Sequence, residues 1–483
     1  MNRLLWGWFV FLSPFFLLQD PADHPPVRHA RDAISGSRML ADVVRLSAPD
    51  FNGRQTGTPD DLASGRFIAD RFSALGLKPR SLVDRATSTI IEPEPVLEFH
   101  AGGFTLPARV GIDYLPILDS PSVNATAPVI FVGYGISDPA HRYDEYEGLD
   151  VRNRIVLFLR GKPESYAGSV TLAEKERTAR EKGTLAYLTL TGPILSAYEA
   201  RKGLHGKPMA IYSQPEGERP LPGAWISAQF AEAVLPAHFI KTGRSLRDIQ
   251  DQLNHLAPQS MATRLSARLV WDSARTPGDL HNVLGLLFGH DPARSEEIII
   301  IGAHRDHFGR QAGLIFPGAD DNASGTAVLL EVARALTQAD PPPARSVLFI
   351  SFSGEEQGLL GSKLYVEHPI HSLKKTVAMI NVDHAGIGNG RLTVGVTGVS
   401  KDTAMQVGRQ IGLADKLDVY GFFAGGDHVP FHEAGVPTIT VVSSGVHPHF
   451  HQPSDTAETV QPDILGEVAH YVLELARHLA EKP

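Results

Sequence analysis

Histidine and carboxylate side chains follow several apolar, β-branched runs in the second half of this chain. They are His304 and Asp306 after IIIIGA, Asp320 and Asp321 in PGADDNASG, Glu355 and Glu356 after SVLFISFSG, Asp383 after TVAMINV, and His447, His449 and His451 near the C-terminus. Taken singly, each is equally well explained as a helix cap or a polar loop residue. Their repetition at the ends of successive runs favours a shared metal site instead.

The number of donors indicates what kind of metal site this would be. Two histidines and three carboxylates, one of them bridging, would give each of two ions three protein ligands and leave a shared position for water. An open position is typical of catalytic rather than structural sites. Nitrogen and oxygen ligands without sulfur favour Zn²⁺, with Co²⁺ or Mn²⁺ as substitutes. One acid of the Glu355 and Glu356 pair is then left without a metal, which is what a general base requires.

The apolar runs have the character of buried strands, which must bring these side chains together. The runs at 297–303, 346–352, 376–382 and 437–442 are rich in Ile, Val and Phe, as in strands that are buried on both faces of a parallel sheet. Carboxyl ends of parallel strands meet at one sheet edge, where ligands commonly bind. The segment 323–336 has a helical pattern between two of these runs. We therefore expect an α/β fold with a mixed, largely parallel sheet sandwiched by helices.

The earlier part of the chain has a different hydrophobic pattern. From Arg31 to Leu77 an apolar stripe at helical spacing is interrupted by FNGRQTGTP, so we expect two helices around a polar loop. We interpret Arg54, within that loop, as a surface residue, with a functional role as the alternative. Between Ser88 and Trp271 short β-rich runs alternate with Gly and Pro, with helices expected at 171–182 and 246–253. This region has no cluster of ligand types, so cover, substrate selection or partner contact is its expected use.

Composition limits the classes of protein to consider. A chain of 483 residues is long enough for two domains, and its formal charge of −9, from 45 basic and 54 acidic residues, argues against a nucleic-acid partner. The chain has no cysteine, which excludes disulfides and thiolate metal ligands. Arg3 and the apolar stretch Leu4 to Leu18 have the character of a secretory signal, with an uncleaved membrane anchor as the alternative. We expect export to a periplasmic or extracellular space.

The motifs GAHRDH, PGADDNASG, SGEEQGLLGS, NVDH and HFHQPSDT, together with GDHVPFHEAGVP, resemble the M28 family of zinc aminopeptidases in order and spacing. The resemblance covers about residues 30 to 80 and 280 to 483, and the interval between resembles a protease-associated (PA) domain. It implies residues 1–20 as signal peptide or N-terminal anchor, residues 28–82 and 276–483 as an M28-like peptidase domain, and residues 83–275 as an inserted β-rich PA-like domain.

The resemblance also implies a role for each site residue. One Zn²⁺ would be held by His304 and Asp383, the other by Glu356 and His451, with Asp321 bridging the two ions. Glu355 would be the general base, and Asp306 would orient His304 from outside the ligand set. The implied activity is hydrolysis of N-terminal residues from peptide substrates by an exported metallo-aminopeptidase.

This chain departs from the family pattern at two places. Arg305 stands where Tyr is common, and would either alter the approach to the metals or face solvent. Phe422 and Phe423 occupy a stretch where some relatives have a Tyr hydroxyl, so stabilisation of the transition state would rest on the metals or on His428.

Two alternatives remain open from the sequence. A carboxypeptidase or dipeptidase on the same scaffold would need a cation to hold the substrate carboxylate, and Arg305 is the near candidate. A non-catalytic, receptor-like relative would have lost ligands, whereas this chain keeps all five and the base. The sequence does not indicate an oligomeric state or a side-chain preference.

Overall fold

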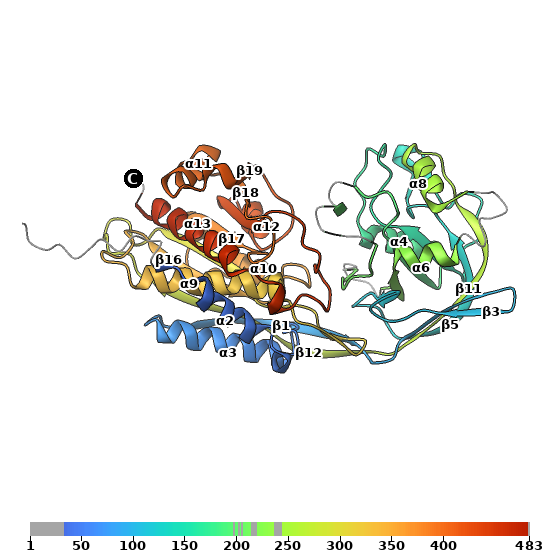
Figure 1. Ribbon diagram of the computed structural model, residues 1–483, viewed down its shortest axis with the longest axis horizontal. Helices are drawn as coiled ribbons and strands as arrows, with labels where there is room; N and C mark the ends of the chain where they lie inside the picture. The colour runs from blue at the N-terminus through green and yellow to red at the C-terminus, as the bar shows by residue number, and fades with distance from the viewer. Residues whose placement is uncertain are drawn as a thin grey trace, which may run out of the picture.

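The computed structural model describes residues 33–196, 199–200, 203, 206–213, 220–235 and 244–481. The expected N-terminal signal or anchor lies outside these residues. Within the described ranges, no helix has both the length and the apolar composition needed to cross a membrane. The chain forms two lobes, each built on an eight-stranded sheet (Figure 1).

The first sheet carries the strands that precede the candidate ligands. Its order is β1 (Arg80–Ile91), β12 (Ser273–Leu287), β16 (Ser346–Phe352), β13 (Ile298–His304), β17 (Thr376–Val382), β20 (Thr438–Ser443), β18 (Leu392–Thr397) and β19 (Leu417–Tyr420). The four central strands β16, β13, β17 and β20 are parallel to one another. Strands β13, β16 and β17 are almost entirely buried, as their continuous apolar sequences predict.

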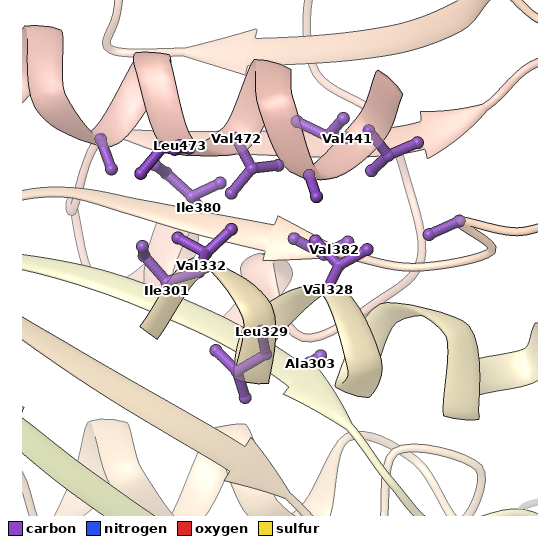
Figure 2. Packing of buried hydrophobic residues seen from close by; sticks show 14 of the residues in the cluster. Ile301, Ala303, Val328, Leu329, Val332, Ile380, Val382, Val441, Val472 and Leu473 are labelled. Carbon is purple, nitrogen blue, oxygen red and sulfur yellow. The ribbon is translucent and has the colours of Figure 1, made fainter. Parts of the chain in front are cut away.

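Helices cover both faces of this sheet. Helices α2 (Gly36–Leu46), α3 (Pro59–Ala74), α9 (Gly325–Thr337), α11 (Lys401–Gln410) and α13 (Pro462–Glu481) pack on one face, and α10 (Leu360–Glu367) and α12 (His428–Glu433) on the other. The first face holds the larger core, in which Val328 and Val332 of α9 meet Ile301 and Ile380 of the strands (Figure 2). This α/β sandwich confirms the predicted fold class.

The second lobe lies between β1 and β12 in the sequence. Its sheet has the order β3 (Phe104–Pro107), β2 (Val96–Ala101), β11 (Met261–Trp271), β5 (Val123–Phe131), β8 (Ile155–Leu159), β9 (Ala186–Leu190), β10 (Gly223–Ile226) and β4 (Tyr114–Pro116). Helices α6 (Ala228–Val234) and α8 (Leu246–Asn254) pack into one of its cores, and α4 (Leu172–Glu181) into the other. The expected helices at 171–182 and 246–253 are thus present. The domain boundaries and the PA-like identity of this lobe stay predictions.

The lobes are joined by paired strands rather than by single linkers. Strands β1 and β12 pair antiparallel along the whole of β1, and short strands β14 (Gly309–Gln311) and β15 (Leu314–Phe316) form a hairpin directly after the first candidate ligand. Phe308 and Phe316, from that part of the first lobe, pack into the core of the second. The second lobe therefore approaches the first beside the carboxyl ends of β13 and β16. A smaller ribbon, β6 (Ser137–Asp138) with β7 (Tyr143–Asp144), lies within the second lobe.

Candidate metal centre

The five predicted ligands converge at the carboxyl end of the central parallel strands. His304 ends β13, Asp383 follows β17, and Glu356 lies in the loop after β16. Asp321 lies in the segment Ala319–Ser324 that leads into α9, at a kink where the backbone is not helical, and His451 lies in the loop between β20 and α13. The sheet edge that the strand pattern indicated is therefore the place where these side chains meet.

The distances divide the five residues into two groups that share one carboxylate. Nε2 of His304 lies 3.5 Å from Oδ1 of Asp321 and 3.4 Å from Oδ1 of Asp383. Nε2 of His451 lies 3.2 Å from Oδ2 of Asp321 and 3.8 Å from Oε2 of Glu356. Asp321 thus presents one oxygen to each histidine, as a bridging carboxylate would.

These donors fit two bound cations. Ligand atoms about 2.0–2.1 Å from a tetrahedral Zn²⁺ lie about 3.3 Å apart, close to the distances within both groups. Nε2 of His304 and Oδ1 of Asp383 are buried, and among the described residues neither has a hydrogen-bond partner. Buried polar atoms without partners are costly, whereas a cation between them would satisfy both.

Glu355 lies next to the first group without being needed as a ligand. A carboxylate oxygen of Glu355, Nε2 or Nδ1 of His304 and an oxygen of Asp383 lie within 4.8 Å of one another. Burial raises the pKa of Glu355 well above its ordinary value, an effect that the His304 charge opposes and Asp427 reinforces. A carboxylate that lies beside a metal site without serving as a ligand is placed to accept a proton from water there.

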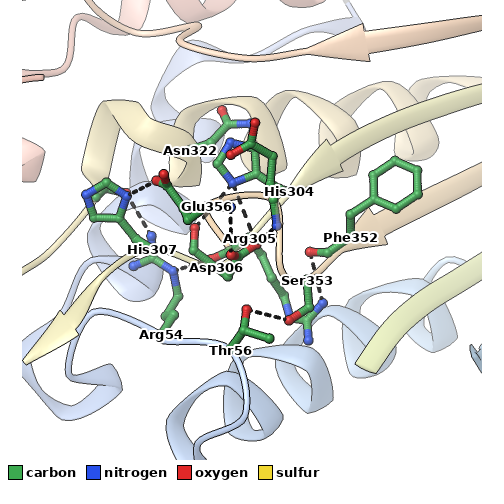
Figure 3. A network of polar contacts seen from close by, with 12 residues as sticks. Arg54, Thr56, His304, Arg305, Asp306, His307, Asn322, Phe352, Ser353 and Glu356 are labelled. Atoms are coloured by element: carbon green, nitrogen blue, oxygen red, sulfur yellow. Dashed lines mark hydrogen bonds and ion pairs between the residues drawn. The ribbon is translucent and has the colours of Figure 1, made fainter. Parts of the chain in front are cut away.

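Asp306 connects His304 to the turn that carries the two glutamates. Its backbone carbonyl lies 3.3 Å from Nδ1 of His304, whereas its Oδ1 lies 3.7 Å from that nitrogen. Its carboxylate accepts the backbone N–H groups of Glu355 at 3.3 Å and Glu356 at 3.4 Å. Its predicted role in orienting His304 therefore remains a proposal, and the structure adds a contact to the glutamates (Figure 3).

Two supporting residues were missed by sequence reasoning. Nδ1 of His307 lies 2.7 Å from Oε1 of Glu356 (Figure 3). The other oxygen of Glu356, Oε2, lies 3.8 Å from Nε2 of His451. The Asp455 carboxylate accepts the backbone N–H groups of Asp320 at 2.9 Å and Asp321 at 3.1 Å. Asp455 belongs to the HFHQPSDT motif, and His307 is the second histidine after the strand, but neither pattern indicates its partner.

A third group of possible ligands is better explained by hydrogen bonds. Oδ2 of Asp320 lies 2.7 Å from Nδ1 of His447 and 3.3 Å from Nδ1 of His384. The shorter distance is below the separation of about 3.3 Å expected for two ligands of one Zn²⁺ ion and is typical of a charge-assisted hydrogen bond. Oδ1 of Asp320 also accepts the backbone N–H of Gly386 at 2.8 Å. Asp320 therefore supports the loop, while its neighbour Asp321 faces the metal centre.

Two arginines near the site are buried, contrary to the expectations from sequence. Arg54 was interpreted as a surface residue, but it is 0% exposed and donates to the carbonyls of Leu46, Arg305, Pro317 and Gly318. Arg305 is also fully buried and forms an ion pair with Asp61 at 2.8 Å. Backbone carbonyls satisfy the Arg54 guanidinium, and carbonyls together with the Asp61 carboxylate satisfy that of Arg305, as buried arginines require.

His281 adjoins Arg305 and gives the fold a pH dependence away from the metals. Its carbonyl accepts Nη2 of Arg305 at 2.6 Å, and burial and the Arg305 charge lower the pKa of His281 to about 4. The imidazole of His281 therefore binds its second proton more tightly in the unfolded chain than in the folded one. The contribution of His281 to stability is complete above its ordinary pKa of about 6.5 and is lost as the pH falls towards 4.

We expect wild type to lose about 1 kcal/mol of unfolding free energy relative to His281→Asn when the pH falls from 7 to 5. This figure is smaller than the full pKa shift implies, because the His281 ring is partly exposed to solvent. Asn keeps a polar group near Ser81, which lies 2.9 Å from Nε2 of His281, but it cannot take up a proton. Urea unfolding at both pH values with saturating zinc measures this. A difference between variant and wild type that is the same at both values would contradict it.

Phe422 and Phe423 stand where some relatives have a Tyr hydroxyl, and the nearby His428 has one ring nitrogen in a hydrogen bond. Nε2 of His428 donates to the carbonyl of Phe423 at 2.6 Å, and burial lowers the pKa of His428. Phe422 is 50% exposed, with its ring 4.7 Å from that of His432. Stabilisation of a transition state by His428 remains a proposal.

Comparisons with known proteins agree with this architecture. Across almost the whole chain the fold is that of solved aminopeptidase structures. An aminopeptidase from Aneurinibacillus sp. strain AM-1 superposes with a TM-score of 0.68 at 22% identity, covering 94% of this chain and 96% of that one. A peptidase M28 precursor from Shewanella amazonensis gives 0.69 at 18% identity, covering 94% and 95%.

The similarity in sequence to known proteins lies in the site-bearing region. Residues 282–476 match the model of Peptidase family M28. A probable leucine aminopeptidase of Arthroderma otae is 32% identical over 202 residues, 39% of this chain and 56% of that protein. Aminopeptidase YwaD of Bacillus subtilis is 32% identical over 187 residues, 36% and 40% of the two chains. The chain is thus similar to peptidase family M28 over that region, and it spans about half the length of the curated relatives it matches.

Proposed function

We propose that this protein is a zinc-dependent aminopeptidase with two metal ions held by His304, Asp321, Glu356, Asp383 and His451. The observation that carries the proposal is the division of these donors into two groups, 3.2–3.8 Å between donors, that share the two oxygens of Asp321. Relatives named as aminopeptidases support the reaction class. The same donor set also supports Co²⁺ or Mn²⁺ as substitutes.

The side chains around the two groups have distinct roles in this proposal. Bound zinc supplies a Lewis acid for the scissile carbonyl and lowers the pKa of a water molecule. The Glu355 carboxylate accepts a proton from the attacking water and returns it to the leaving amine. His307 and Asp306 hold Glu356 and the backbone of the glutamate turn, so that Glu355 and Glu356 keep different orientations.

The positions of the two buried arginine side chains favour an aminopeptidase over a carboxypeptidase. Arg305 was the candidate for holding a substrate carboxylate, but it pairs with Asp61 and donates to the carbonyls of Ser351 and Phe352. Arg54 is likewise turned towards backbone carbonyls. Neither arginine is therefore placed to hold a substrate carboxylate, which a carboxypeptidase or dipeptidase would need.

Two further parts of the proposal concern the rest of the chain. We retain the export of the protein to a periplasmic or extracellular space, with membrane attachment only if the N-terminal segment is uncleaved. We also retain the assignment of residues 83–275 as a PA-like domain inserted in a peptidase domain of residues 28–82 and 276–483. The position of the second sheet between β1 and β12 supports this division.

Zinc content measured together with a substrate panel tests the function. We expect about two zinc ions per chain and hydrolysis of aminoacyl p-nitroanilides and of C-terminally amidated peptides. N-acetylated versions of the same substrates should be inert, because the blocked amine carries no charge. Hydrolysis of the acetylated substrates, or a requirement for a free C-terminal carboxylate, would exclude an aminopeptidase and favour the carboxypeptidase alternative.

A further inference from the structure

A short segment of the second lobe, Pro208–Tyr212, contacts the loop that carries His451. Nδ1 of His451 lies 2.9 Å from the carbonyl oxygen of Ala210, and the backbone N–H of Ala210 donates to the carbonyl of His451 at 3.1 Å. Next to this pair, Nε2 of Gln452 donates to the carbonyl of Pro208 at 2.8 Å. We call this set of three hydrogen bonds between the lobes the 210–451 bridge.

The 210–451 bridge determines which nitrogen of His451 can bind a metal. A carbonyl oxygen only accepts hydrogen bonds, so Nδ1 of His451 must carry the hydrogen. The lone pair then lies on Nε2, which faces Asp321 and Glu356. Partners of this kind fix the tautomer and the ring orientation of histidine ligands.

The backbone of His451 also needs support from its surroundings. Its φ is 56°, in the left-handed region that residues other than glycine rarely adopt. Such conformations cost on the order of 1–3 kcal/mol and persist where neighbouring contacts enforce them. The hydrogen bond from Ala210 to the carbonyl of His451 is a contact of that kind.

The segment is anchored in the second lobe on its other side. The backbone N–H and the hydroxyl of Ser213 donate to the Asp119 carboxylate at 2.8 Å and 2.7 Å. The backbone N–H of Leu118 donates to the carbonyl of Ile211 at 2.9 Å. The ring centroids of Tyr212 and Phe308 lie 6.0 Å apart, and those of Phe308 and His451 lie 4.6 Å apart. A displacement of the second lobe would therefore be transmitted to the histidine.

We propose that the second lobe completes the metal centre by positioning His451 through Ala210. This inference rests on the proposed function, because it requires His451 to be a zinc ligand. It assigns the lobe a role beyond the cover, substrate selection or partner contact expected from its sequence. Ala210 acts as a positioning residue, since its carbonyl contacts the ligand and not the substrate.

The test loosens the bridge from both sides and measures zinc affinity by competition with a chromogenic chelator. Gln452→Leu removes the bond to Pro208, and Asp119→Ala releases Ser213. We expect one of the two zinc ions to bind about 10–100-fold more weakly in each variant, as for loss of a partner that orients a ligand. The other ion, beside His304, should keep its wild-type affinity, which also shows that the first lobe is folded.

Leu269→Val in β11 is the matched control, because Leu269 is buried in the second lobe's core and is not part of the bridge. Unchanged affinity of both ions in Gln452→Leu and Asp119→Ala would overturn the inference, as would an equal weakening in Leu269→Val. Fewer than two zinc ions in the wild-type protein would instead contradict the proposed function. The two failures are therefore distinguishable.

Discussion

Glu355→Gln should retain both zinc ions while its turnover falls by roughly 10²–10⁴-fold, the loss typical of removing a general base. Gln has the shape of Glu and keeps hydrogen-bonding capacity, but it cannot accept the proton. KM should change little, because the base acts mainly in the transition state. Zinc per chain and steady-state kinetics on an aminoacyl p-nitroanilide measure both quantities.

Glu356→Ala is the comparison that separates the two adjacent glutamates. Oε2 of Glu356 lies 3.8 Å from Nε2 of His451, so its removal takes a donor from the second group. We expect this variant to lose zinc as well as activity. Near wild-type turnover in Glu355→Gln, or zinc loss there with zinc retained in Glu356→Ala, would reverse the assignment.

Asp321→Ala should have the largest effect on metal content, lowering zinc from about two ions per chain to below one and abolishing measurable hydrolysis. Its two oxygens lie 3.5 Å and 3.2 Å from the Nε2 atoms of His304 and His451, so one substitution removes a donor from both groups.

Removal of metal by a chelator should abolish activity to the same extent, and added zinc or cobalt should restore it in the wild type only.

Asp320→Asn provides the control for Asp321→Ala, because the two acids are adjacent and equally buried. Oδ2 of Asp320 bonds to His447 at 2.7 Å rather than facing the metal centre. This variant should keep about two zinc ions per chain. Loss of both ions in Asp320→Asn with retention in Asp321→Ala would show that the bridging position has been assigned to the wrong residue.

The fold was predictable from sequence where hydrophobic pattern alone decides the structure. The runs that end at His304, Gly354 and Asp383 are short and dominated by Ile, Val, Leu, Phe and Met, with few polar residues such as Ser351 and Asn381. This composition favours strands buried on both faces, and a parallel sheet then brings their ends together. The helical segment at 246–253 was predictable from its amphipathic pattern, and the mostly polar segment at 171–182 from residue types that favour helices. The candidate ligands followed because each lies within a few residues of a strand end.

Residues whose role depends on distant backbone atoms were not predictable. Arg54 is buried because four carbonyls surround it, three of them from residues beyond 300, and no local pattern shows them. Ala210 has no functional group in its side chain, so a search for ligand types in the second lobe passes over it. His307 lies close to His304 in sequence, but its partner Glu356 is set by the packing of β13 against β16.

The wide separation of the ligands along the chain bears on when and where the protein acquires metal. The donors extend from His304 to His451, and the 210–451 bridge adds a residue from much earlier in the chain. Contacts of such high sequence separation form only when most of the chain has folded, so a nascent or unfolded chain offers no preformed site. If the chain crosses a membrane before folding, as the proposed export requires, the metal supply of the destination compartment decides which ion the protein receives.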